Sequence, residues 1–91
     1  MIYGLIFSER AEDGLAKLKK SEKTSYKKAV KLLDELQEHP TTGTGKPERL
    51  KHYTEPTWSR RISDKHRLVY RIQDEVVIVL VISAYGHYED K

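Results

Sequence analysis

The chain has 91 residues, which is enough for one domain with a modest core, so we expect residues 1–91 to form a single domain. It contains no cysteine, which excludes disulfides, thiolate nucleophiles and cysteine-based zinc sites and favours the cytoplasm as its compartment. The net charge of +3 is uneven, because residues 46–71 carry eight Lys and Arg against three Asp and Glu. This middle part is where a polyanion should bind, although basic side chains that only solvate a sheet face would give the same pattern.

The first part of the chain predicts a strand followed by two helices. Residues 1–7 are apolar but lack the basic start of a signal peptide, so they indicate a strand. Ser8 is a suitable N-cap for a helix on which Ala11, Leu15 and Leu18 recur at helical spacing. Ser21 is placed to cap a second helix that ends at His39-Pro40. Its apolar stripe consists of Tyr26, Val30, Leu33 and Leu36 or Gln37, widened by Ala29 and Leu32.

The second part predicts an antiparallel meander. Residues 41–47 contain two glycines and a proline, which is typical of a loop. Three strands follow, Trp58–Ser63, Arg67–Ile72 and Val76–Ala84, joined by short polar turns. The last strand is apolar on both faces and should lie inside the sheet. The fold class is therefore α+β, with an N-terminal strand, two helices and then an antiparallel meander sheet. No apolar run approaches the roughly 20 residues that span a bilayer, so we expect no membrane association.

Alternation along the strands gathers arginines on the open face of the sheet. In Arg67–Ile72 the side chains expected under the helices are Leu68, Tyr70 and Ile72. Those expected on the opposite face are Arg67, Val69 and Arg71. Arg61 has the same orientation in the preceding strand, so pairing of the two strands brings Arg61 close to Arg67. Two neighbouring guanidinium groups favour an anion between them, and a phosphate fits their geometry. The alternative is neutralisation by a nearby carboxylate, for which the candidates are Glu48, Glu55 and Asp64.

Glu48 and His87 are candidates for proton transfer. Glu48 lies in the basic segment 45–52, where a salt bridge is the commonest role, but a carboxylate beside a phosphate can also accept a proton from a ribose 2′-hydroxyl. His87 follows a buried strand, and histidine can deliver a proton near neutral pH; a frayed C-terminus is the alternative. His39, His52 and His66 lie at a helix end or in or beside turns. No motif for a nucleotide, a cofactor or a metal ion is present, so an enzyme would use metal-independent proton transfer.

Five sequence blocks stand in order along residues 43–88. They are Gly45-Lys46-Pro47-Glu48, Leu50-Lys51-His52, Trp58-Ser59-Arg60-Arg61-Ile62, His66-Arg67-Leu68-Val69-Tyr70 and Gly86-His87-Tyr88. Together they resemble the Txe/YoeB toxins of the RelE superfamily, which belong to type II toxin–antitoxin modules. The resemblance implies a microbial-RNase-like fold, cleavage of messenger RNA in the ribosomal A site, and an antitoxin partner of the YefM/Phd type. It also implies homodimerisation as a further possibility, since related toxins often dimerise.

The resemblance implies a role for each matching residue. Glu48 matches the general base, Arg67 the phosphate and transition-state ligand, and His87 the general acid. Tyr88 matches a residue that orients the scissile region or stacks on a base. The expected RNA- or phosphate-binding residues are Lys51, Arg61 and Lys46. The chain departs from some relatives at two places: residues 89–91 follow the His-Tyr pair, and Tyr85-Gly86 stands where an arginine occurs elsewhere.

Two non-catalytic functions are alternatives. ParE-like toxins resemble this architecture but bind DNA gyrase, a function that does not need the set of Glu48, Arg67 and His87. A protein that blocks the ribosomal A site without cutting would present the same basic face. The second alternative predicts that charge-neutral replacements of Glu48 and His87 leave growth inhibition intact.

Overall fold

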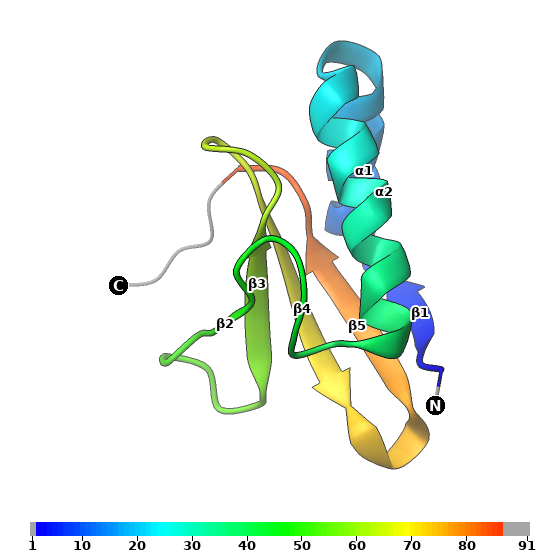
Figure 1. The fold of residues 1–91 in the computed structure, drawn as a ribbon, viewed down its shortest axis with the longest axis vertical. Coiled ribbons are helices and arrows are strands. Elements are labelled where there is room, and N and C mark those ends of the chain that lie inside the picture. Colours follow the sequence, from blue (N-terminus) through cyan, green and yellow to red (C-terminus); the bar gives the residue numbers. More distant parts are fainter. Residues whose placement is uncertain (1, 87–91) are drawn as a thin grey trace.

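The computed structural model describes residues 2–86. The elements along the chain are β1 (Gly4–Phe7), α1 (Glu9–Ser21), α2 (Lys23–Glu38), β2 (Glu48–Arg49), β3 (Thr57–Arg61), β4 (Arg67–Gln73), the 3₁₀ helix η1 (Asp74–Val76) and β5 (Ile78–Ser83) (Figure 1). The strands form one sheet in the order β1-β5-β4-β3-β2. The α+β class is confirmed, with one addition: β1 pairs parallel to β5, so the sheet is mixed.

The start of α1 follows the prediction, whereas the start of α2 does not. Ser8 Oγ accepts the Ala11 N–H at 3.0 Å and donates to the Ile82 carbonyl at 2.6 Å, so this cap also ties α1 to β5. The prediction that Ser21 caps α2 is wrong. Ser21 is the last residue of α1, where its hydroxyl donates to the Lys17 carbonyl at 2.9 Å. Glu22 alone separates the helices, so no polar loop remains to hold a side-chain cap.

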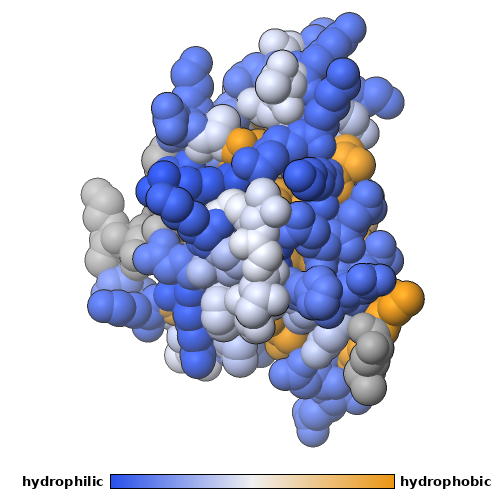
Figure 2. All heavy atoms as spheres, in the orientation of Figure 1, coloured by the Kyte–Doolittle hydropathy of each residue, from blue (hydrophilic) through white to orange (hydrophobic). Residues whose placement is uncertain are grey.

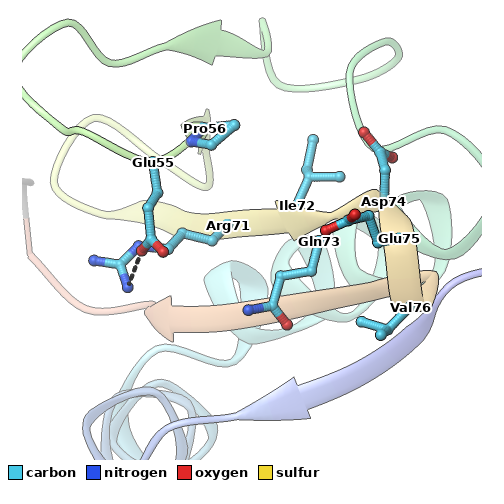
Figure 3. A pocket seen from close by; sticks show the side chains of 8 residues that line it. All are labelled: Glu55, Pro56, Arg71, Ile72, Gln73, Asp74, Glu75 and Val76. Atoms are coloured by element: carbon cyan, nitrogen blue, oxygen red, sulfur yellow. Dashed lines mark ion pairs between the residues drawn. The ribbon is translucent and has the colours of Figure 1, made fainter.

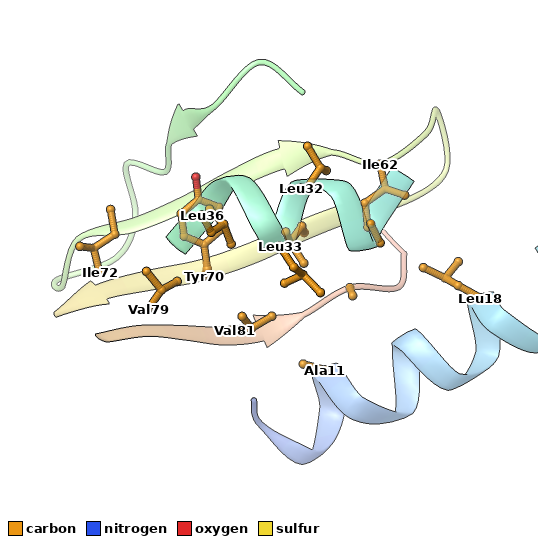
Figure 4. Packing of buried hydrophobic residues seen from close by; sticks show 13 residues of the cluster. Ala11, Leu18, Leu32, Leu33, Leu36, Ile62, Tyr70, Ile72, Val79 and Val81 are labelled. Carbon is orange, nitrogen blue, oxygen red and sulfur yellow. The ribbon is translucent and has the colours of Figure 1, made fainter. Parts of the chain in front are cut away.

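The core lies between the helix pair and one face of the sheet (Figure 4). Its α2 contribution is centred on Leu32 and Leu36, both fully buried, and Val30 is 38% exposed. The stripe predicted through Val30 is therefore displaced by part of a turn toward Ala29 and Leu32. The two interior strands β4 and β5 supply Leu68, Tyr70, Ile72, Val79 and Val81 to the core. Within residues 2–86, neither helix is long and apolar enough to cross a membrane.

The strand bounds differ from the predicted ones at the turns. β3 ends at Arg61, two residues earlier than predicted, and β5 begins at Ile78 because η1 occupies Asp74–Val76. Val77 has a left-handed φ of +55°, which ends the turn before β5 starts. β5 lies between β1 and β4, so the prediction of an interior strand is confirmed. The two-residue strand β2, which pairs with β3, was not predicted because its sequence has no strand periodicity.

Arg60 is the largest fully buried side chain in residues 2–86. Its guanidinium donates to Glu35 Oε1 at 3.0 Å, to the Thr42 carbonyl at 2.7 Å and to the Tyr70 hydroxyl at 3.1 Å, and also to the His39 carbonyl. Burial raises the pKa of Tyr70, so its hydroxyl stays neutral and donates in turn to a backbone carbonyl. Arg60 therefore fastens the segment after α2 to β3, one residue before Arg61.

Acidification is expected to weaken the fold through Glu35. A hydrogen bond from Thr44, whose N–H lies 2.8 Å from Glu35 Oε1, and then the charge of Arg60 hold the pKa of Glu35 below its usual value. Because the pKa is lower in the folded state, ionised Glu35 stabilises the fold fully at a pH above its unfolded-state pKa of about 4.3. This stabilisation is lost as the pH falls through the folded-state pKa. Urea titrations at several pH values should show a steeper acid loss of unfolding free energy for wild type than for Glu35→Gln. The exposed Glu38→Gln is the control, and equal slopes for wild type and Glu35→Gln would contradict the coupling.

Candidate active site

The segment before β2 is held against β3 by close backbone contacts. Gly45 and Lys46 both have left-handed φ values, +85° and +52°. A Cβ on Gly45 would lie 3.0 Å from the Arg61 carbonyl oxygen, closer than a side chain tolerates without a shift. The Gly45 carbonyl accepts the Arg61 N–H at 2.7 Å. Because the Gly45 backbone contacts the Arg61 backbone, the next residues, Lys46 to Glu48, lie at the edge of the sheet beside Arg61.

Strand register brings the charged side chains together on the sheet face away from the helices. Glu48 pairs with Ser59 across β2 and β3, and Arg61 pairs with Arg67 across β3 and β4. Side chains directly opposite one another in such pairs have Cβ atoms about 4.5–5.5 Å apart. The predicted juxtaposition of Arg61 and Arg67 is therefore confirmed. Arg67 Nη1 donates hydrogen bonds to the carbonyl oxygens of Ser63 at 2.5 Å and His66 at 3.1 Å.

These side chains surround a pocket of about 310 Å³. Its lining residues are Lys46, Pro47, Glu48, Ser59, Arg61 and Arg67. The part of the lining that the structure describes thus has three cationic groups and one carboxylate. Among residues 2–86, neither Arg61 nor Arg67 forms an ion pair with a carboxylate, and Glu55, one of the expected neutralising groups, pairs with Arg71 at 3.1 Å. An excess of guanidinium charge in a concave site favours a bound phosphate.

The pocket can combine phosphate binding with proton transfer. Arg61, Arg67 and Lys46 supply donors for phosphate oxygens, and Glu48 supplies a carboxylate. A carboxylate next to a bound phosphate is placed to accept a proton from a neighbouring hydroxyl. In the described range 2–86, no group of three or more His, Asp or Glu residues is arranged to hold a metal ion.

Of the other predicted site residues, the structure describes Lys51, which is not in the pocket lining. Lys51 is exposed in the turn after β2. His87 and Tyr88 lie outside the described residues, as do residues 89–91. Ser59, which was not among the predicted site residues, lines the pocket and is 3% exposed. The strand alternation that places Arg61 on the open face also places Ser59 there, so the signal was present.

His66 was expected only to lie in or beside a turn, but in the structure its side chain is buried and hydrogen-bonded. It is 4% exposed, and its ring contacts both the junction of the helices and the backbone after β5. The alternation that puts Leu68 and Tyr70 under the helices extends back to His66, which was the available signal.

A second pocket of about 570 Å³ lies at the other end of β4 (Figure 3). Its charged lining residues are Glu55, Arg71, Asp74 and Glu75, of which Glu55 and Arg71 form an ion pair. Acidic groups therefore outnumber basic ones, and none of the predicted site residues is among them. The face shown in Figure 2 is mostly hydrophilic, with apolar residues in small separate areas. The pocket between β2, β3 and β4 is thus the candidate site for an anionic substrate.

Comparisons with known proteins agree on one family. Residues 7–88 match the family model described as YoeB-like toxin of bacterial type II toxin–antitoxin system. Toxin YoeB of Escherichia coli K12 is 39% identical over 75 residues, covering 82% of this chain and 89% of that protein. Toxin RelK of Mycobacterium tuberculosis is 44% identical over 77 residues, covering 85% and 87%.

Solved structures show the same fold. The YoeB/ParE toxin from Agrobacterium tumefaciens matches with a TM-score of 0.86 at 30% identity, covering 93% of this chain and 99% of that one. The YoeB dimer from Staphylococcus aureus matches with a TM-score of 0.84 at 31% identity, covering 97% and 100%. The YoeB–YefM complex from the same organism matches with a TM-score of 0.79 at the same identity and coverage.

Proposed function

The chain belongs to the family of YoeB-like toxins of bacterial type II toxin–antitoxin systems, and on that premise we propose that it is a metal-independent endoribonuclease that cleaves messenger RNA in the ribosomal A site. The observation that carries the proposal is the pocket that joins Glu48 to Arg61 and Arg67. Glu48 supplies a general base beside the two guanidinium groups that would bind the phosphate, and attack by a ribose 2′-hydroxyl needs this combination. A gyrase-binding toxin has no need of this combination.

The proposed reaction is an in-line transfer at one phosphate of the message. Glu48 takes the proton of the 2′-hydroxyl, and the 2′-oxygen forms a bond to the adjacent phosphorus. Arg67, with Arg61, Lys46 and Lys51, stabilises the negative charge that develops on the phosphate oxygens. His87 donates a proton to the 5′-oxygen as its bond to phosphorus breaks. The products are a 2′,3′-cyclic phosphate and a 5′-hydroxyl, and Tyr88 orients the scissile region or stacks on a base.

Arg67 is suited to its proposed role because its guanidinium is anchored on one side. Nη1 donates to the carbonyls of Ser63 and His66. A guanidinium fork held in this way needs little reorganisation when charge develops on the phosphate, which is the basis of electrostatic stabilisation in active sites. Arg61 is exposed on the neighbouring strand and carries a second fork toward the same space. This arrangement supports a role for the pair in binding two oxygens of one phosphate.

The proposed partners follow from relatives whose structures contain them. The S. aureus YoeB matched here was solved with YefM and also as a dimer. We accordingly propose an antitoxin of the YefM/Phd type for this chain, and a homodimer as a further assembly. The ribosome and its bound message are the proposed targets, and the cytoplasm is the proposed compartment.

The test adds purified protein to ribosomes stalled with a defined codon in the A site and maps the 5′ ends of the message. We expect a cut within the A-site codon, and no cut in the same message without ribosomes. A 2′-deoxynucleotide at the attacked position should abolish the cut, because the attacking oxygen is then missing. The His87→Gln variant is expected to lose cleavage by about 10²–10⁴-fold.

Two outcomes would contradict the proposal. A cut that survives the 2′-deoxy substitution would exclude attack by the 2′-hydroxyl. An intact message with translation still blocked would favour a toxin that binds without cutting. In that case, inhibition of gyrase supercoiling would separate a ParE-like target from the ribosome.

A further inference from the structure

The charges of α2 are arranged in the opposite order to the one that stabilises a helix. Its first eleven residues, 23–33, include four lysines and no acid, and three acids follow in residues 34–38. The N-terminal end of a helix carries a partial positive charge, so lysines are unfavourable there and acidic residues are unfavourable at the C-terminal end. α1 has the favourable order, with acidic residues in its first turn and lysines in its last. Helix stability therefore accounts for the charges of α1 but not for those of α2.

Three of these lysines form a row along the outer face of α2. Lys23, Lys27 and Lys31 recur at every fourth residue, and all three are exposed. This recurrence places them on one face of the helix, about 6 Å apart along its axis. Like charges at this spacing destabilise a helix. Among residues 2–86, none of the three forms an ion pair with a carboxylate that would offset the repulsion.

The lysine row begins at the end of the molecule where Arg67 lies. Glu22, which separates the two helices, has its Oε2 atom 2.8 Å from Nε2 of the buried His66. His66 directly precedes Arg67, which lines the candidate pocket. The helix junction projects beyond the strands at this end of the molecule (Figure 1). The lysine row and the pocket are therefore two basic surfaces that the contact between Glu22 and His66 holds in a fixed relation.

The opposite end of the molecule is acidic. The backbone N–H of Tyr3 donates to the Gln37 carbonyl at 2.6 Å, and the Tyr3 hydroxyl donates to Asp74 at 2.6 Å. These bonds place η1 beside the acidic C-terminal end of α2. The second pocket, in which acidic groups outnumber basic ones, includes η1. A polyanion would therefore attract one end of this molecule and repel the other, which orients the protein as it binds.

We propose that the lysine row binds the sugar–phosphate backbone of folded ribosomal RNA, while the candidate pocket holds the message. This inference rests on the proposed nuclease function, because that function places the protein on the ribosome. Lysine binds phosphate as a compact point charge, and RNA helices are recognised mostly by their shape and through phosphates and 2′-hydroxyls. A protein partner fits the lysine row less well, because protein–protein interfaces are depleted in lysine and enriched in aromatic residues.

Replacing Lys23 and Lys27 together by Gln tests the lysine row. Lys31 is left in place because its charge also lowers the pKa of Glu35. Binding of the purified protein to ribosomes that carry no message is measured at several salt concentrations. We expect this Gln variant to bind at least about tenfold more weakly than wild type at low salt. The slope of log affinity against log salt concentration should become shallower by about 1.4–1.8, since each lost phosphate contact removes about 0.7–0.9.

Two further double variants are the matched controls. Lys23→Arg with Lys27→Arg keeps both charges and should keep the wild-type slope. Arg10→Gln with Arg71→Gln removes the same net charge but should leave binding unchanged, because Arg10 lies in the first turn of α1 and Arg71 lines the second pocket. The urea midpoint of the Gln variant should equal or exceed that of wild type, because two like charges are removed from the positive end of α2. Weaker binding is then not a loss of the fold.

Cleavage of a ribosome-bound message separates binding by the lysine row from chemistry in the pocket. Because the lysine row does not contact the reacting phosphate, the Gln variant should show a raised KM with kcat nearly unchanged. Replacement of the proposed base Glu48 should show the converse, a lowered kcat with binding retained.

The outcomes separate this inference from the proposed function. If wild type binds ribosomes but does not cut, the nuclease function fails, and the binding data alone decide the role of the lysine row. If wild type cuts and the Gln variant keeps its affinity and salt slope, the lysine row does not bind RNA, which leaves an acidic protein as its partner. A loss seen only on ribosomes that carry a message, or an equal loss in the Arg10 and Arg71 control, also contradicts the inference. Weaker binding to ribosomes without message, restored by the Arg replacements, supports it.

Discussion

Replacing Glu48 by Gln is expected to slow single-turnover cleavage of a ribosome-bound message by about 10²–10⁴-fold. Among residues 2–86, Glu48 is the one carboxylate in the lining of a pocket that otherwise carries cationic and neutral side chains. Glutamine keeps the size and the hydrogen-bonding capacity of the side chain but cannot accept the proton of the 2′-hydroxyl. The rate should fall while binding to the ribosome persists, and the variant should no longer inhibit growth.

Glu55→Gln is the matched control for this replacement. Glu55 is an exposed carboxylate in the same basic part of the chain, and it pairs with Arg71 outside the candidate pocket. Its replacement should leave the cleavage rate within about twofold of wild type, as expected of a surface ion pair. If the Glu48→Gln variant cleaves as fast as wild type, Glu48 is not the general base. Persistent growth inhibition by a variant that no longer cuts would favour the blocking alternative.

Replacing Arg60 by Met is expected to lower the free energy of unfolding by about 3–5 kcal/mol. Arg60 is fully buried, and its guanidinium joins Glu35 to backbone carbonyls at Thr42 and His39. Methionine fills similar space but leaves these acceptors without their donor, and a buried polar group without a partner is costly. Urea unfolding followed by circular dichroism measures the change.

Arg61→Met is the control for Arg60, because the same replacement is made at the next position on the exposed face. We expect it to change the unfolding free energy by less than about 0.5 kcal/mol. Its effect should instead appear as weaker cleavage, since Arg61 lines the candidate pocket. If Arg60→Met were as stable as Arg61→Met, the buried guanidinium would not be what holds the segment after α2 to β3.

The two arginines show how far strand alternation alone can predict function. Successive residues of a strand point to opposite faces, so the pattern of β3 assigns Arg61 to the open face and Arg60 to the core. The exposed position of Arg61 was predicted, but the burial of Arg60 was not, because arginine is rarely fully buried unless it is paired. The partners that make burial tolerable lie in α2 and in the loop after it. Periodicity within β3 contains no information about them.

The position of β2 illustrates a different limit. Residues 41–47 were correctly predicted to form a loop, yet the strand that follows has only two residues and no periodicity. Its pairing with β3 depends on the left-handed turn at Gly45 and Lys46 and on the fit of Gly45 against Arg61. Turn-forming residues indicate that the chain reverses, but the direction in which it leaves the turn depends on the surface it packs against.

By itself, the sequence determined the order of β1, the two helices and the strands β3 to β5, and with it the α+β class. It also determined the buried face of β4, the interior position of β5 and the pairing of Arg61 with Arg67. These features follow from local periodicity and from adjacent strands joined by short turns. Only the tertiary structure decided the parallel pairing of β1 with β5, the place of Glu48 beside Ser59 and the bonds of His66 to Glu22 and Gly86. Each of these joins segments far apart in the chain or held by one particular turn. Their geometry is set by the packing of the whole domain, which no local pattern encodes.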